Sequence, residues 1–298
     1  MLRAFAAACL GVLLLPQSGS QAPGPVSIEM RNVILHAAPD AVVAVNWLSG
    51  RLRSSSGHIP VFDDQHSFII EIDDGEVTID APNLTALVNR AFDYKGSALS
   101  NLRITFEDGH LVQHGTLKKG VGVPFSIVAS VAATSDGLLD VHALKVKTAG
   151  IPTAKLMSLF GVELDDILKS RPDKGINIHD NEVFLDPARM LPAPPMKGHL
   201  TSSFIRGDRL VQVFGKGGTA AARQQGNYIW FRGASIRFGR LTMSDADLKL
   251  IDMDPKDPFD FYPERYHEQL VAGYSKNTPD HALRTYMPDF NDLPRRRR

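Results

Sequence analysis

Residues 102–111 read LRITFEDGHL, and this stretch decides the expected fold. Leu102, Ile104 and Phe106 alternate with polar residues, Asp108-Gly109 follows, and Leu111 begins a second apolar series. Alternation with period two is typical of a strand that buries one face, and Asp-Gly is the residue pair that a tight hairpin turn favours. The stretch therefore predicts an antiparallel hairpin.

The same pattern recurs along the chain. It predicts hairpins around Asp74-Gly75, Asp136-Gly137 and Gly207-Asp208, and two more around Pro39-Asp40 and Asp180-Asn181. The turns are unevenly spaced, which argues against a solenoid or a propeller. Further strands are expected between Tyr228 and Ile251, followed by a loop rich in Asp and Pro over Asp252 to Pro258.

Three segments have helical spacing instead. Apolar residues three and four positions apart predict helices over Pro82 to Phe92 and Thr153 to Leu168, and a last helix over Pro263 to Tyr274. Helices between hairpins indicate the α+β class: a long curved antiparallel β-sheet built from hairpins, with two or three helices packed against it.

Composition narrows the possible functions. The chain has 298 residues, with 33 Lys and Arg balancing 33 Asp and Glu. A balanced charge gives no broad basic surface, so we expect no nucleic-acid partner. The apolar fraction of 43% is sufficient for a packed core, which argues against disorder.

The N-terminus predicts export. Arg3 precedes an uncharged apolar run from Ala4 to Leu15, and Ser20 to Ala22 suit a cleavage site, as in a secretory signal peptide. We therefore divide the chain into a signal peptide (1–22), a main domain (23–215) and a C-terminal extension (216–298), and expect a periplasmic or secreted protein. The single Cys, Cys9, lies in the signal segment, so the mature chain would have no thiol.

Candidate sites for metal or catalysis are few. His110 and His114 are four residues apart on a predicted strand, which separates them by about 13 Å, too far to share an ion. The acidic loop with Asp252, Asp254, Asp257 and Asp260 could bind calcium, but a solvated turn is the preferred interpretation because the ligand order of an EF-hand is absent. We found no G-x-S-x-G, Walker A or dinucleotide motif, and we expect no cofactor, no metal and no catalytic residue.

Arginines end the chain, and they could contact anionic lipid as a peripheral membrane attachment, although a solvated tail is the simpler interpretation. These are Arg295, Arg296, Arg297 and Arg298.

Several phrases between about Val26 and Gly215 are similar to a known family. They are DAPNLTALVN (80–89), GVPF (122–125), IPTAKLM (151–157), GINI (175–178), FLDP (184–187), Leu191-Pro192 and RGDRL (206–210). In the order of its elements and in these short sequence segments, this part of the chain resembles the LmeA-like phospholipid-binding proteins of the TULIP-like group. The resemblance implies a curved sheet beside a helix, an elongated apolar groove for acyl chains, export, and no catalytic residues.

Candidate groove residues come from this resemblance and from the apolar faces of the predicted strands. The resemblance implies Leu87, Val88 and Phe92 on the first helix, Met157, Phe160 and Leu164 on the second, and Phe125 and Ile127 on the sheet. The strand pattern adds Ile104, Phe106, Phe204 and Phe214, for which an ordinary core is the default interpretation.

Three hypotheses remain open. The first is an exported, non-enzymatic binding or carrier protein for phospholipid or another hydrophobic ligand in the bacterial envelope. The second is an envelope scaffold with a dry core. The third is an enzyme with a polar site around Asp245, Asp247, Asp252 and Asp254.

Overall fold

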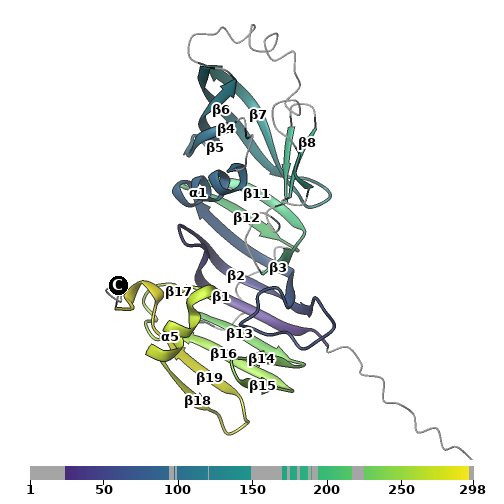
Figure 1. The fold of residues 1–298 in the computed structure, drawn as a ribbon, viewed down its shortest axis with the longest axis vertical. Coiled ribbons are helices and arrows are strands. Elements are labelled where there is room, and N and C mark those ends of the chain that lie inside the picture. The colour runs from purple at the N-terminus through teal and green to yellow at the C-terminus, as the bar shows by residue number, and fades with distance from the viewer. Residues whose placement is uncertain are drawn as a thin grey trace, which may run out of the picture.

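The computed structural model describes residues 24–93, 97, 99–119, 121–148, 170–172, 175–179, 182–186, 189, 194–216 and 225–294. Most of this chain forms antiparallel sheet that curls like half a barrel in an elongated molecule (Figure 1). The expected α+β arrangement, an antiparallel sheet with helices, is confirmed at this level. The predicted signal peptide, the helix over 153–168 and the terminal arginines lie outside the described residues.

An eleven-stranded sheet forms the larger part of the molecule. Nine strands follow in the order β11-β12-β3-β2-β1-β13-β16-β19-β18, while β10 pairs with β3 and β17 with β1. Their bounds are β1 (Val26–Ala38), β2 (Ala41–Ser54), β3 (Phe68–Asp80), β10 (Met196–Lys197), β11 (Leu200–Arg206), β12 (Arg209–Phe214), β13 (Tyr228–Gly233), β16 (Ala246–Asp252), β17 (Phe259–Phe261), β18 (Tyr274–Asn277) and β19 (Leu283–Met287).

β1 connects the main domain with the C-terminal extension. It pairs antiparallel with β2 on one side and with β13 on the other, so the main domain and the C-terminal extension share one sheet. Alternate residues of these strands point into one core, where Ile28, Phe231 and Leu248 are buried. The C-terminal segment thus supplies part of the core on which β1 packs.

A six-stranded sheet lies at the other end of the long axis (Figure 1). Its order is β4-β5-β6-β7-β9-β8, and β11 of the larger sheet lies against β6. The bounds are β4 (Leu99–Glu107), β5 (His110–Lys119), β6 (Val121–Ala133), β7 (Leu139–Thr148), β8 (Ile176–His179) and β9 (Glu182–Leu185). A separate hairpin is formed by β14 (Ile236–Phe238) and β15 (Leu241–Met243).

Helix α1 (Ala81–Phe92) packs between the two sheets, close to the predicted range. Asp80 caps it by accepting a hydrogen bond from the backbone N–H of Asn83 at 2.9 Å, and Pro82 occupies the first turn, where its missing N–H is tolerated. Leu87 and Val88 face inward. Within the described residues, no helix is long and apolar enough to cross a membrane.

Four of the predicted turns are confirmed at described residues. Asp108 and Gly109 join β4 to β5 with positive φ angles, and Gly137 and Gly207 have positive φ in the loops of β6–β7 and β11–β12. β1 and β2 form the hairpin expected around Pro39-Asp40. β8 and β9 pair as expected, but Asp180 and Asn181 between them lie outside the described residues.

The turn predicted at Asp74-Gly75 is wrong. β3 runs straight through this pair, and Gly75 is in register with Leu48 of β2 and with Phe214 of β12. Because both neighbouring strands bond the backbone here, the chain gains more by extending than by turning. Glycine instead permits close packing of strands, since a Cβ at position 75 would lie 3.1 Å from the Trp47 carbonyl oxygen.

The last predicted helix is shorter than expected. A 3-10 turn η3 (Pro263–Arg265) leads into α5 (Tyr266–Ala272), and Tyr274 already begins β18. A second 3-10 turn, η4 (Phe290–Asp292), follows β19. The tyrosine assigned to the helix belongs to a strand because Tyr274 pairs with Tyr286 of β19, a contact that helical spacing cannot reveal.

Gly50 gives a first prediction. A Cβ there would overlap the backbone carbonyl of Glu71, at a register shift between β2 and β3. Because the obstacle is backbone, we expect Gly50→Ala to lower the free energy of unfolding by about 3 kcal/mol, as overpacked sites do. Gly24→Ala is the control, since its nearest neighbour would be 3.7 Å away. Equal urea midpoints for the two variants would contradict this reading of Gly50.

Candidate functional site

Apolar side chains gather where α1 meets the six-stranded sheet. The buried members are Val88, Leu102, Ile104 and Leu111, and partly buried neighbours include Phe92, Phe106 and Phe125. The Phe125 ring and Leu102 meet over Gly115, where a Cβ would lie 2.6 Å from the ring. Five of the predicted groove residues (Val88, Phe92, Ile104, Phe106 and Phe125) are thereby brought together.

Two more predicted residues, Leu87 and Phe214, lie in an adjoining cluster with Leu139 and Leu210, which Phe106 also contacts. Phe204 does not join either cluster. Its neighbour Ile205 packs inward, so alternation turns Phe204 to the opposite face, where it is 38% exposed and the Arg206 guanidinium lies over its ring. Met157, Phe160 and Leu164 lie outside the described residues.

The apolar face of this sheet continues beyond α1 along β6 and β7. Val123 and Ile127 follow the parity of Phe125, and Val146 is paired with Ile127. All four side chains are only partly buried. Phe125 belongs to the cluster beneath α1, whereas the other three belong to none of the buried clusters. We call Val123, Phe125, Ile127 and Val146 the apolar strip.

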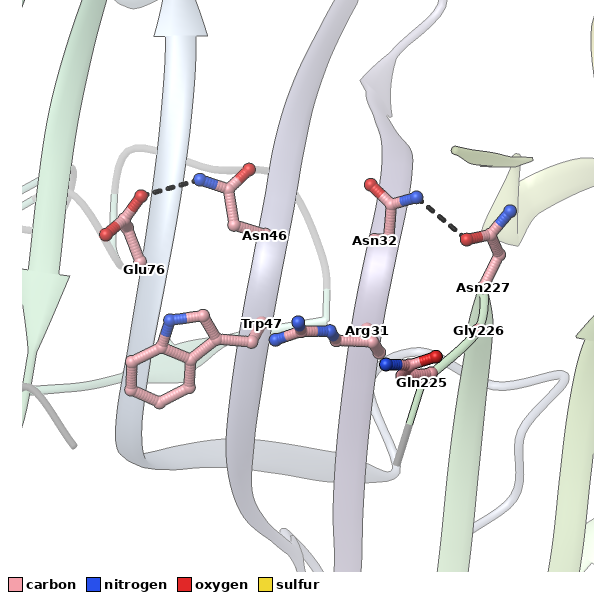
Figure 2. A pocket seen from close by; sticks show the side chains of 8 residues that line it. All are labelled: Arg31, Asn32, Asn46, Trp47, Glu76, Gln225, Gly226 and Asn227. Atoms are coloured by element: carbon pink, nitrogen blue, oxygen red, sulfur yellow. Dashed lines mark hydrogen bonds between the residues drawn. The ribbon is translucent and has the colours of Figure 1, made fainter. Parts of the chain in front are cut away.

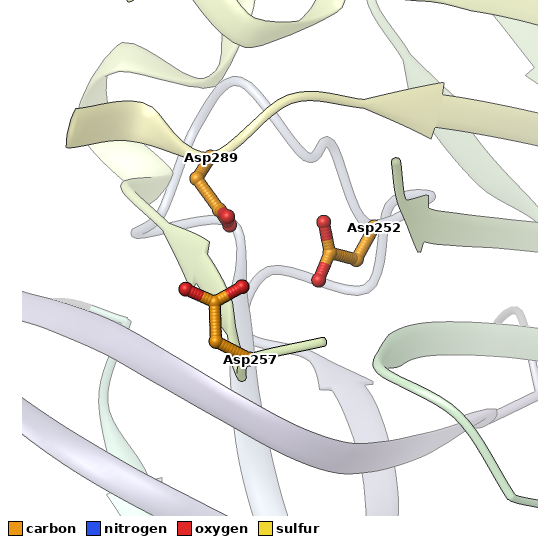
Figure 3. Close-up of side chains that lie close together, drawn as sticks. All are labelled: Asp252, Asp257 and Asp289. Atoms are coloured by element: carbon orange, nitrogen blue, oxygen red, sulfur yellow. The ribbon is translucent and has the colours of Figure 1, made fainter. Parts of the chain in front are cut away.

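A second candidate is an acidic cluster near the C-terminus (Figure 3). Carboxylate oxygens of Asp252, Asp257 and Asp289 lie within 4.8 Å of one another, and Asp252 and Asp289 are buried. Burial raises the pKa of Asp289 to about 7, helped by the neighbouring carboxylates, although the backbone N–H of Asp260 opposes the shift. Burial likewise raises the pKa of Asp252.

This cluster differs from the predicted acidic loop. Asp289 joins it although it is distant in sequence, while Asp254 accepts a hydrogen bond from the Lys256 N–H and Asp260 pairs with His36 at 2.6 Å. The Asn227 side-chain amide donates to Asp252 at 3.0 Å and to the Asp257 carbonyl. These contacts describe a structural junction between β16, β17 and the segment after β19.

The four carboxylates of the hypothesised enzyme site, Asp245, Asp247, Asp252 and Asp254, do not come together. Asp247 and Asp252 are five residues apart on β16, so they point to opposite faces. Burial opposes ionisation of Asp247, but hydrogen bonds from Arg284 at 2.7 Å and Trp230 at 2.7 Å outweigh it and lower its pKa. His110 and His114 are both on β5, and His110 Nδ1 contacts the Asp108 carbonyl.

A solvent-open pocket of about 540 Å³ lies on the polar face of the larger sheet (Figure 2). β1, β2, β3 and the segment before β13 contribute its lining: Arg31, Asn32, Asn46, Trp47, Glu76, Gln225, Gly226 and Asn227. Asn46 donates to Glu76 at 2.6 Å, and Asn32 donates to Asn227 at 2.7 Å. No sequence motif marks this pocket, because its residues come from four separate segments.

Comparisons with protein-family models, with curated proteins and with solved structures found no match for this chain.

Proposed function

We propose that this chain is an exported, non-enzymatic protein of the cell envelope that binds a lipid or another hydrophobic ligand at the apolar strip. The observation that supports it is the partial exposure of Val123, Phe125, Ile127 and Val146 on the face on which Leu102, Ile104 and Leu111 are buried together with Val88 of α1. The resemblance of residues 26–215 to LmeA-like phospholipid-binding proteins points in the same direction, including to an elongated groove along this face.

Burial of hydrocarbon would supply the binding energy. Each CH₂ group of an acyl chain that leaves water gains about 0.8 kcal/mol, and the same contact would cover the exposed part of the strip. Two polar side chains lie on this part of the face: Gln113, paired with Ile127 across β5 and β6, and Thr148, paired with Phe125 across β6 and β7. Such a lining selects for apolar length and not for charge.

The test is an Ile127→Asp variant of the full chain. A carboxylate on the strip must lose its hydration when a chain covers it, so we expect affinity for a fluorescent fatty acid to fall more than tenfold. Solvent extraction of the wild-type protein, followed by mass spectrometry, should recover lipid that the variant does not retain.

Ser126→Asp is the matched control, because Ser126 is next in sequence, pairs with His114, and points to the other face. It should retain the wild-type affinity. If the wild-type protein neither retains lipid nor binds the fatty acid, or if both variants lose it equally, the proposal is wrong.

A scaffold in the envelope is the second candidate. It is favoured by β18, an edge strand of the larger sheet whose four residues are all exposed and which includes the 45% exposed Tyr274. Unpaired edge groups are a ready template for another strand. If this candidate is right, we expect Ser275→Pro to abolish co-purification of a partner, and we expect the wild-type protein not to bind the fatty acid.

Membrane contact through Arg295–Arg298 remains part of the first proposal.

A further inference from the structure

Arg31 has no ion-pair or hydrogen-bond partner among the described residues, although it is partly buried in the pocket of Figure 2. The other arginines on neighbouring strands of this face are paired. Arg51 bonds Asp73, Arg53 bonds Glu71, and Arg284 bonds Asp247. A guanidinium that gives up part of its hydration without a carboxylate is expected to find an anion elsewhere.

Two acids on the same face as Arg31 are already engaged. Glu29, two residues away on β1, accepts from the Tyr228 hydroxyl and lies 3.7 Å from Arg232. Glu76, on the β3 side of the pocket, accepts from Asn46 and from Arg206 at 3.1 Å. Arg31 is therefore the one cation in the pocket lining, and no described residue compensates its charge.

We propose that this pocket binds the anionic group, a phosphate or a carboxylate, of a small hydroxylated ligand, with Arg31 as the cation that recognises it. The planar guanidinium can donate two parallel hydrogen bonds to such a group. Carboxamides of Asn46 and Gln225 line the same space and can add neutral donors.

Glu76 narrows the class of ligand. Figure 2 shows Arg31 and Glu76 on different strands with Trp47 between them. An anion alone would be repelled by this carboxylate, whereas hydroxyl groups next to the anion can donate to it. A glycerophosphate has this combination, either as a free molecule or as the headgroup of a lipid.

The site is separate from the apolar strip. It lies on β1, β2 and β3 of the larger sheet, while the strip lies on β6 and β7 of the smaller one. The inference therefore does not rest on the proposed function, and Ile127→Asp should leave anion binding unchanged.

Calorimetric titration of the full chain with glycerol 3-phosphate tests the site, and tryptophan fluorescence, from Trp47 in the pocket lining and from Trp230, gives a second signal. We expect saturable binding that weakens at high salt. Arg31→Gln should weaken it at least about tenfold, the loss of a charge-assisted contact, and Arg31→Lys should weaken it less. Arg53→Gln is the control, because it removes an equal charge that is already paired with Glu71.

Two results would overturn the proposal. One is the absence of saturable binding of glycerol 3-phosphate. The other is an equal loss of affinity in Arg31→Gln and Arg53→Gln, which would show a general effect of charge. Vesicles of phosphatidylglycerol in phosphatidylcholine then distinguish the sources. Arg31-dependent binding to these vesicles supports a lipid headgroup, and Arg31-dependent binding of free glycerol 3-phosphate without vesicle binding supports a soluble ligand.

Discussion

Replacing Gln269 with leucine is expected to lower the free energy of unfolding by about 4 kcal/mol or more. Gln269 on α5 is fully buried, and its side chain bonds three backbone groups. It accepts from the Tyr262 N–H at 3.0 Å and donates to the carbonyls of Asp260 at 2.8 Å and Pro288 at 2.9 Å. Leucine would leave all three groups buried and unpaired, at about 1 to 3 kcal/mol each.

The measurement is a urea titration followed by circular dichroism. Val271→Leu is the control, because Val271 lies on the same helix and is 84% exposed, so its replacement should change stability by less than about 0.5 kcal/mol. A loss below about 1 kcal/mol in Gln269→Leu would mean that the three backbone groups find other partners.

Asp289→Asn is expected to stabilise the protein in mild alkali and to have little effect in acid. The pKa of Asp289 is raised from 3.8 to about 7 in the folded protein, first by burial. The folded state therefore holds this proton more tightly than the unfolded state. That stabilisation is complete below pH 4 and is lost as the pH rises through 7.

At pH 8 the wild-type protein must bury this charge, which costs at most about 4 kcal/mol for a shift from 3.8 to about 7. Asparagine is neutral at every pH, and its Oδ1 can still accept the Asp260 N–H that Asp289 accepts at 2.6 Å. The difference in stability between Asp289→Asn and wild type should thus grow from pH 4 to pH 8. Asp292→Asn, at an exposed position nearby, should show no such growth, and a flat difference for Asp289→Asn would contradict the pKa shift.

Local signals predicted much of the secondary structure. Asp108-Gly109 lies between two alternating runs, and a turn with positive φ forms there because no described strand pairs with these two residues. The Asp80 cap and Pro82 similarly fix the start of α1 from within a few residues. At Asp74-Gly75 the same signal failed, because β2 and β12 continue on both sides of β3.

The candidate sites were harder to predict because their members meet only in the folded chain. Asp252 and Asp257 stood out as an acidic loop, but Asp289 and Asn227, which complete the junction, have no local pattern that connects them to it. Arg31 stands out only because no described residue pairs with it in the folded chain, and a sequence does not show ion pairs. By contrast, alternation correctly indicated that Ile104 and Phe125 belong to one apolar face.

The pairing of β1 with β13 has a kinetic consequence. Ile28 is in register with Phe231, so β1 lacks its second neighbour on the ribosome until more than two hundred further residues have been made. Contacts between residues so distant in sequence close large loops, and chains dominated by them fold slowly. Until then the apolar side of β1 stays open to other partners. The larger sheet of such a chain can therefore be completed only near the end of synthesis or after it.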